Sequence, residues 1–205
     1  MKKKILSFVL AFCFLIPCAL ALNACNENVE TEKCTVTKEE WNNAMDYAKQ
    51  ENLTISSKNV PEGNYSATAS VVKYDGTKIY WSQWFEEDSE ASLVEYYYVK
   101  DGNIYTKIEK GAKGNSSYTI SKSEYDDVLE NERRNILNNL SYDDFSFNEE
   151  TKAYVSNDNC ITVSFTFENG NLAKIDVVKL NNSSGSVPFR ETTTITFEKV
   201  TITLP

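Results

Sequence analysis

The chain has 205 residues, 25% of them charged, with a formal net charge of −9 and no histidine. This acidity argues against a nucleic-acid partner, because such binding depends on neutralising phosphates with basic residues. It also argues against a domain lying flat on an anionic membrane, which attracts basic surfaces. The absence of histidine removes the commonest metal ligand and a frequent general base.

The first 24 residues have the pattern of an export signal. Three lysines at positions 2–4 precede the apolar run ILSFVLAFCFLIP, which is the order found in secretory signal peptides. A transmembrane anchor is the alternative, because apolar residues continue to Leu22. A span needs about 20 apolar residues, however, and the small residues after Pro17 are typical of the approach to a cleavage site. We therefore expect residues 1–24 to be removed on export.

Cys25 lies in a sequence that resembles a bacterial lipobox, in which a cysteine is acylated and becomes the new N-terminus. Leu22, Ala24 and Cys25 fit that pattern, whereas Asn23 departs from it. Cleavage after the ALA at 19–21 is the alternative. The polar stretch NENVETEK that follows is typical of a tether. We expect an acyl group on Cys25, a tether over residues 25–36, and attachment to the extracytoplasmic side of a membrane.

Removal of the signal changes both the charge and the cysteine count. Three of the 21 basic residues leave with residues 1–24, so 18 remain against 30 acidic ones and the net charge becomes −12. Cys34 and Cys160 remain as an even pair in an oxidising compartment, which permits one disulfide. Two separate thiols are the alternative, and the sequence leaves both open.

Two segments carry the signals of amphipathic helices. In TKEEW, Thr37 and Glu40 form an S/T-x-x-E capping box, and Ser121 and Glu124 form the same box in SKSEY. Apolar residues then recur at helical spacing, so each helix should bury one face. These positions are Trp41, Ala44, Met45 and Ala48 in the first segment, and Tyr125, Val128, Leu129, Ile136, Leu137 and Leu140 in the second.

Most of the remaining sequence is predicted to be strand. Three segments each hold two extended runs around Asp75-Gly76, Asp101-Gly102 or Asn169-Gly170. Such dipeptides are strong hairpin signals because they accept the positive φ of tight turns. A last run, TTTITFEKVTITLP, changes phase after Phe197, which predicts a bulge or a tight turn there.

These elements predict one α+β domain over residues 37–205. No β-α-β alternation occurs, so a parallel sheet is not expected. We expect a large curved antiparallel sheet, a half-barrel of hairpins, with the two amphipathic helices packed on one side.

Large rings occur on both faces of the predicted strands IYWSQWF and EYYYV, although a half-buried sheet should be apolar on one face only. Helices could cover one face while tyrosines occupy the other. A curved sheet that holds an apolar ligand beneath the helices is the second explanation. The residues expected to line such a site are Trp81, Trp84, Tyr97 and Phe165.

The sequence contains no recognisable catalytic or metal-binding motif. It has no G-x-S-x-G elbow, P-loop or dinucleotide fingerprint. The acidic clusters EEDSE and SYDDFSFNEE lack the alternating ligands and central glycine of an EF-hand loop. Two carboxylates could still hydrolyse a glycoside, but no spacing selects a pair. We therefore expect no catalytic activity, no cofactor and no bound metal.

The order of helix, long hairpins, capped helix and further hairpins resembles the LolA/LppX-like lipoprotein fold. The resemblance covers residues 37–205 and rests on TKEEW, YDGTKIY and TITFEKVTITLP. It implies an unclosed half-barrel around an apolar cavity, binding of a lipid or acyl chain, and no catalysis. No functional residue transfers, because no motif here corresponds to a binding position of that family. A carrier such as LolA diffuses freely, whereas the lipobox predicts a protein attached to a membrane. We therefore expect this chain to carry or sense its ligand while anchored.

The sequence therefore leads to two hypotheses. The first is a monomeric, membrane-anchored extracytoplasmic lipoprotein that binds a lipid or acyl chain in the groove of a half-barrel. The second is a surface structural or interaction module that binds protein or glycan through exposed aromatic residues and has no ligand cavity.

The anchor can be tested by mass spectrometry of the exported protein. We expect an N-terminus at Cys25 and the added mass of acyl groups on that residue. An N-terminus upstream of Cys25, or an N-terminal peptide without lipid mass, would contradict acylation.

Overall fold

The computed structural model describes residues 34–86, 94–111, 113–137, 140–158, 160–180 and 187–205. The predicted signal peptide, Cys25 and the tether up to residue 33 lie outside this part of the chain. Within it, no helix has both the length and the apolar character needed to cross a membrane.

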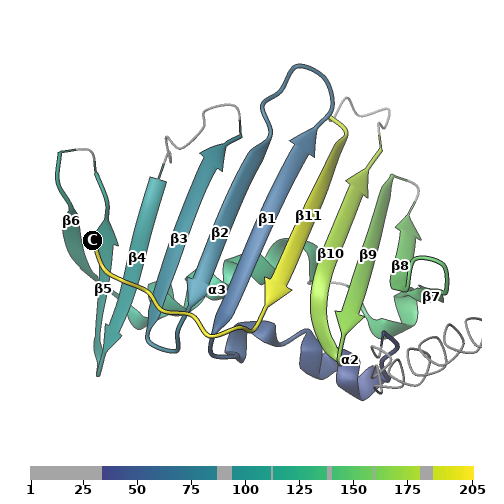
Figure 1. Ribbon diagram of the computed structural model, residues 1–205, viewed down its shortest axis with the longest axis horizontal. Coiled ribbons are helices and arrows are strands. Elements are labelled where there is room, and N and C mark those ends of the chain that lie inside the picture. Colours follow the sequence, from purple (N-terminus) through teal and green to yellow (C-terminus); the bar gives the residue numbers. More distant parts are fainter. Residues whose placement is uncertain (1–33, 87–93, 112, 138–139, 159, 181–186) are drawn as a thin grey trace, which may run out of the picture. The chain divides into compact units, whose positions relative to one another are not determined.

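The described residues form an 11-stranded antiparallel sheet in the order β6-β5-β4-β3-β2-β1-β11-β10-β9-β8-β7 (Figure 1). Strands β1 to β6 are added outward in one direction, and β7 to β11 return from the opposite edge. The two halves meet where β1 pairs with β11, from Thr54↔Thr196 to Pro61↔Phe189. The strands are β1 Leu53–Pro61, β2 Thr68–Tyr74, β3 Lys78–Phe85, β4 Val94–Asp101, β5 Ile104–Glu109, β6 Ser116–Ile120, β7 Ser146–Asn148, β8 Ala153–Asp158, β9 Ile161–Glu168, β10 Asn171–Lys179 and β11 Phe189–Thr196.

The three predicted hairpin turns are confirmed. They join β2 to β3, β4 to β5 and β9 to β10. Gly76 and Gly170 have φ values of +93° and +80°, which residues with a Cβ rarely adopt. In the first turn the Asp75 carboxylate accepts from the backbone N–H groups of Thr77 and Lys78, at 3.0 and 2.7 Å.

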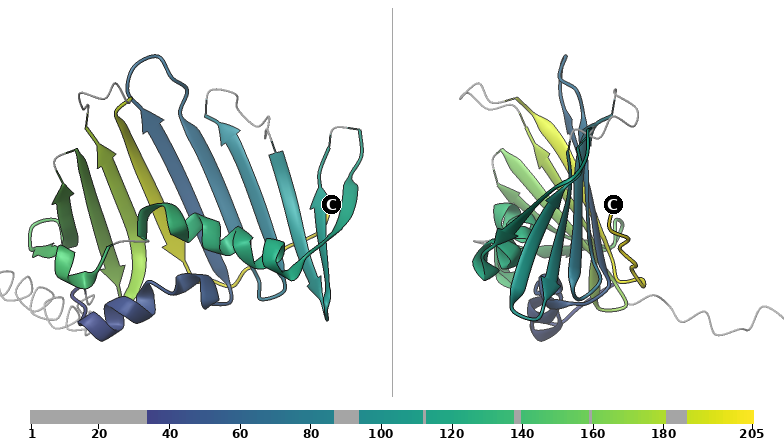
Figure 2. Two further views of the ribbon diagram at one scale, coloured as in Figure 1. Left: turned by 180° about the vertical axis from the view of Figure 1, so that it is seen from behind. Right: turned by 90° about the vertical axis from the view of Figure 1, so that its left-hand side faces the viewer.

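The helices lie on one side of the sheet, as predicted (Figure 2). They are α2 Lys38–Ala44 and α3 Lys122–Leu137, with the short 3-10 helices η1 Tyr47–Lys49 and η2 Tyr142–Asp144 beside them. The capping box at Thr37 is present, since Thr37 Oγ1 accepts from Glu40 N at 3.2 Å and Glu40 Oε2 accepts from Thr37 N at 2.8 Å. At α3, Ser121 Oγ accepts from Glu124 N at 3.1 Å.

We call the covered side of the sheet the helix face and the other side the open face. Ile55, Val72 and Ile79 point to the helix face and are buried. Their neighbours along the strands, including Thr54, Lys73 and Tyr80, point to the open face because alternate residues of a strand face opposite sides. The α+β fold with an unclosed antiparallel sheet and helices on one side is thus confirmed.

Trp41 is the centre of the core beneath α2. Its ring centroid lies 5.0 to 5.6 Å from those of five other aromatic rings. These rings belong to Tyr142, Phe145, Tyr154, Phe165 and Phe167. The hydroxyl of Tyr154 also accepts from the backbone N–H of Val36 at 3.0 Å and donates to its carbonyl at 2.9 Å, which fixes the chain just before α2.

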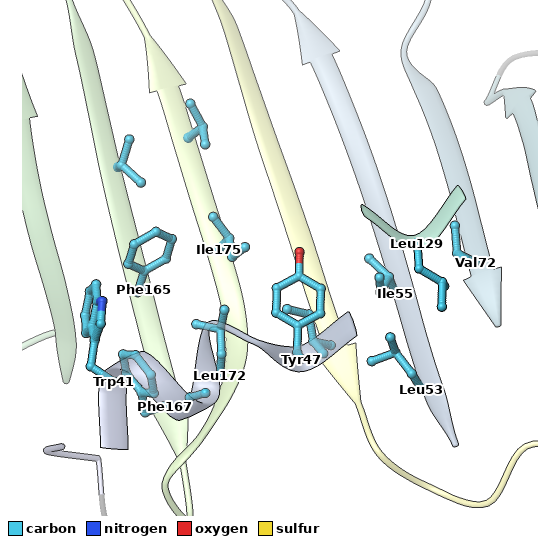
Figure 3. Close-up of a cluster of buried hydrophobic side chains, with 14 of the residues drawn as sticks. Trp41, Tyr47, Leu53, Ile55, Val72, Leu129, Phe165, Phe167, Leu172 and Ile175 are labelled. Atoms are coloured by element: carbon cyan, nitrogen blue, oxygen red, sulfur yellow. The ribbon is translucent and has the colours of Figure 1, made fainter. Parts of the chain in front are cut away.

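A second group of core side chains lies beneath η1 and α3. The side chains that meet there are those of Tyr47, Leu53, Ile55, Val72 and Leu129 (Figure 3). The hydroxyl of Tyr125 on α3 donates to the carbonyl of Thr77 in the β2–β3 turn at 3.0 Å. The space between helices and sheet is therefore filled by side chains along much of its length.

The C-terminal segment, residues 197–205, leaves the sheet. Strand β11 ends at Thr196, and the chain then crosses the open face from β11 toward β5, on the side opposite the helices (Figures 1 and 2). Ile202 is only 6% exposed, and Val200 N donates to Asn52 Oδ1 at 3.3 Å. The phase change after Phe197 thus marks the end of the strand instead of a bulge within it.

No disulfide joins Cys34 to Cys160 in the structure. Val36 is bound to Tyr154 near the start of β8, whereas Cys160 follows the end of that strand at Asp158. A strand extends about 3.3 Å per residue, and a disulfide needs Cα atoms within about 7 Å. The structure therefore favours the alternative of two separate thiols.

The Trp41 cluster generates a stability prediction. Replacing Trp41 with alanine should lower the free energy of unfolding by about 3–5 kcal/mol, because it leaves a large cavity among five rings. Tyr65→Ala is the control, since Tyr65 is 62% exposed and its loss should change stability by about 0.5 kcal/mol or less. Urea unfolding of both variants measures the difference, and equal effects would contradict the central role of Trp41.

Tyr98 generates a pH prediction. Burial raises the pKa of Tyr98 to about 12, whereas the phenol of an unfolded chain ionises near its ordinary value of about 10. The unfolded state therefore loses its proton first, so the contribution of Tyr98 to stability is complete below pH 10 and disappears between about pH 10 and 12. Tyr98→Phe should show a shallower loss of stability over this window in urea unfolding. An equally steep loss would contradict the assignment.

Candidate functional site

The four residues predicted to line a ligand site lie on different faces of the sheet. Phe165 is on the helix face, fully buried beside Trp41. Trp81 is also on the helix face, where its ring stacks on Tyr96 with centroids 5.5 Å apart. Trp84 and Tyr97 are on the open face. Strand alternation therefore separates the four into two pairs, and they do not line one common site.

Small pockets lie on the helix side of the sheet, bordered by described residues. One, between α3 and η1, has a volume of about 170 Å³ and is bordered by Tyr74, Tyr125 and Leu129. Another, of about 230 Å³, lies over β1, β2, β3 and β11, where Ser57, Ser70 and Gln83 are among its lining residues. Ligand pockets usually enclose about 300–1,000 Å³. Both pockets are smaller than that range, and core side chains largely fill the space beneath α2, η1 and α3.

The open face has a groove of about 970 Å³. Strands β1, β2, β3 and β11 form it, so it extends across the pairing that joins the two halves of the sheet. Figure 1 looks onto this face. The volume lies within the range of ligand pockets, and we refer to this site as the open-face groove.

Hydroxyl side chains make up the β1–β11 part of the groove. Thr54 and Ser56 come from β1, and Thr192 and Thr194 come from β11. The β11 threonines lie in register with Lys58 and Ser56. Threonine suits these positions because its branched side chain is favourable in strands. The hydroxyls of Thr192 and Thr194 donate within the protein, to Asp176 Oδ1 at 2.7 Å and to the Ser56 carbonyl at 3.4 Å. The oxygens of these hydroxyls can still accept hydrogen bonds from a ligand, and the hydroxyls of Thr54 and Ser56 can also donate.

The β2–β3 part of the groove combines aromatic and small apolar side chains with Ser70, Lys73 and Ser82. Trp84 and Tyr80 of β3 face it, together with Ala69 and Val71 of β2. The Tyr80 ring lies 5.1 Å from that of Tyr97 on β4, which is buried. This part of the groove therefore offers an apolar surface beside the hydroxyl floor.

An ion pair holds the Tyr80 hydroxyl in one orientation. Tyr80 Oη donates to Glu95 Oε1 at 3.0 Å, and Lys110 Nζ lies 2.5 Å from Glu95 Oε2. The hydrogen bonds from Lys110 and Tyr80 lower the pKa of Glu95, while burial raises the pKa of Tyr80. Glu95 therefore stays ionised and Tyr80 stays neutral at physiological pH.

The groove has the chemistry of a binding site. Its charged lining residues are Lys58 and Lys73. In the described part of the chain, no group of three or more Cys, Asp or Glu side chains could hold a metal ion. Hydroxyls, an indole and two ammonium groups suit ligand recognition.

Sequence reasoning did not find this groove as a site. The alternation Thr54, Ser56, Lys58 on β1 was visible, but polar alternation is typical of any strand that faces water. The pairing of β1 with β11 could not be predicted, because the two strands lie far apart in the sequence.

The sequence matches no protein-family model and none of the curated proteins with which it was compared. The open-face groove is therefore interpreted from its own residues.

Proposed function

We propose that this chain is a membrane-anchored extracytoplasmic lipoprotein that binds a glycan in its open-face groove. The anchor is supported by the signal pattern, the lipobox-like LNAC and the polar tether. The glycan is supported by one observation above all, namely a floor of hydroxyls beside Trp84 in a groove of about 970 Å³.

A sugar ring needs both kinds of surface that the groove provides. Its C–H face is apolar and packs against an aromatic ring by dispersion and by release of water. Its hydroxyls need hydrogen-bonding partners that can both donate and accept, as serine and threonine do. An open groove also allows an extended chain to continue into solvent at both ends.

A lipid or acyl chain is the second candidate ligand. Ala69, Val71 and the indole of Trp84 favour it, because each buried methylene contributes about 0.8 kcal/mol. A chain lying in an open groove would keep one side in water and so gain only part of that energy. The hydroxyl floor would also lose hydration against an acyl chain without gaining hydrogen bonds. The glycan therefore ranks first.

One pair of variants distinguishes a glycan ligand from a lipid ligand. The purified protein should bind members of a glycan array, and Trp84→Ala should weaken that binding at least tenfold, equivalent to about 1.4 kcal/mol. Tyr118→Ala is the control, since Tyr118 is an exposed ring on edge strand β6 outside the groove. Thermal unfolding checks that both variants are folded.

Lipid extraction tests the alternative that the groove binds an acyl chain. Mass spectrometry of organic extracts from protein isolated from its native host should find no stoichiometric lipid. A co-purifying lipid that is lost in Trp84→Ala, together with an absence of glycan binding, would replace the glycan with the acyl chain.

A further inference from the structure

The charge of the open-face groove is opposite to that of the chain. The protein has a formal net charge of −9, yet the charged residues that line the groove are two lysines, Lys58 and Lys73, and none is acidic. Building on the glycan proposed above, we infer that the ligand of the groove is an acidic glycan, whose anionic groups pair with Lys73.

Lys58 is already neutralised by a carboxylate. Its Nζ lies 2.7 Å from Glu86 Oε2 at the end of β3. Two further carboxylates on the open face are neutralised in the same way, Glu95 by Lys110 at 2.5 Å and Asp176 by Lys174 at 2.7 Å. These three pairs contribute little net charge, so they neither attract nor repel an anion strongly.

Lys73 differs from Lys58. It is exposed, and no ion pair joins it to another of the residues that the structure describes. The register places it between Thr54 of β1 and Tyr80 of β3. Its ammonium group therefore rises from the floor where the hydroxyls meet the aromatic side, and a sugar bound there could present a carboxylate, sulfate or phosphate to it.

A second exposed cation lies further along the same face. Arg190 of β11 is in register with Val60 of β1, and Lys73 is in register with Thr54. Six residues of strand separate these two positions, which corresponds to about 20 Å. An anion repeated along a sugar chain could contact both cations, with the neutral Lys58–Glu86 pair between them.

The acidity of the rest of the molecule does not prevent this binding. At physiological ionic strength the Debye length is about 8 Å, so exposed charges farther away are largely screened. An anion in the groove is attracted to Lys73 and Arg190, while the carboxylates of Glu86, Glu95 and Asp176 are each paired with a lysine.

The inference is tested with acidic and neutral sugar chains of matched backbone. The pairs are oligogalacturonate with its methyl ester, and dextran sulfate with dextran. We expect at least one acidic chain to bind ten times more tightly than its neutral partner. Lys73→Gln should reduce that affinity about fivefold to tenfold, leave the affinity for the neutral partner nearly unchanged, and make binding less sensitive to salt.

Two further lysines serve as controls. Lys58→Gln should have a smaller effect, since its charge is balanced by Glu86. Lys107→Gln should have none on binding, because Lys107 lies on the helix face, 4.0 Å from the centroid of the Tyr96 ring. An equal loss in all three variants would indicate a non-specific charge effect and overturn the assignment to Lys73.

The outcomes also separate this inference from the function on which it rests. Equal binding of acidic and neutral chains, weakened by Trp84→Ala but not by Lys73→Gln, would overturn the acidic ligand and leave the glycan in place. Failure of every acidic and neutral chain, here and on the array, would overturn both.

Discussion

The packing of Trp41 is the interaction on which the arrangement of the molecule depends. Helix α2 has seven residues, which is too short to be stable without tertiary contacts. Its indole is surrounded by rings from η2, β8, β9 and the segment between η2 and β7, and Tyr154 bonds to the backbone immediately before the helix. These contacts fix α2 on one face, where α3 also packs, so the opposite face remains accessible over the centre of the sheet.

The accessible face provides the groove that the proposed binding function requires. The open-face groove takes its hydroxyls from β1 and β11, one strand from each half of the chain. Its aromatic wall comes from β3, whose Tyr80 is held by the Glu95–Lys110 pair. A ligand in this groove would therefore contact side chains whose positions are set by the whole sheet, and not by one mobile loop.

Local features of the fold were predictable from sequence, and non-local ones were not. Thr37 and Ser121 cap helices because their hydroxyls accept from nearby backbone N–H groups, and Gly76 turns a hairpin because it tolerates positive φ; both effects act within a few residues. Strand alternation also separates Trp81 from Trp84. Which of these two faces the helices cover could not be read, because both carry rings. The partnership of Thr54 with Thr196 depends on the complete sheet and leaves no local signal.

Strand β11 comes last in the domain's sequence but lies in the middle of the sheet, so the stability of the domain depends on its C-terminal segment. Terminal segments of a domain are normally its most dispensable parts, and an edge strand can be lost while the rest of a sheet persists. Here residues 189–205 include the strand that joins β1 to β10 and the segment that buries Ile202 on the open face. A protease or a premature stop codon acting there would remove the middle of the sheet, leaving two half-sheets that each expose a new, unpaired edge.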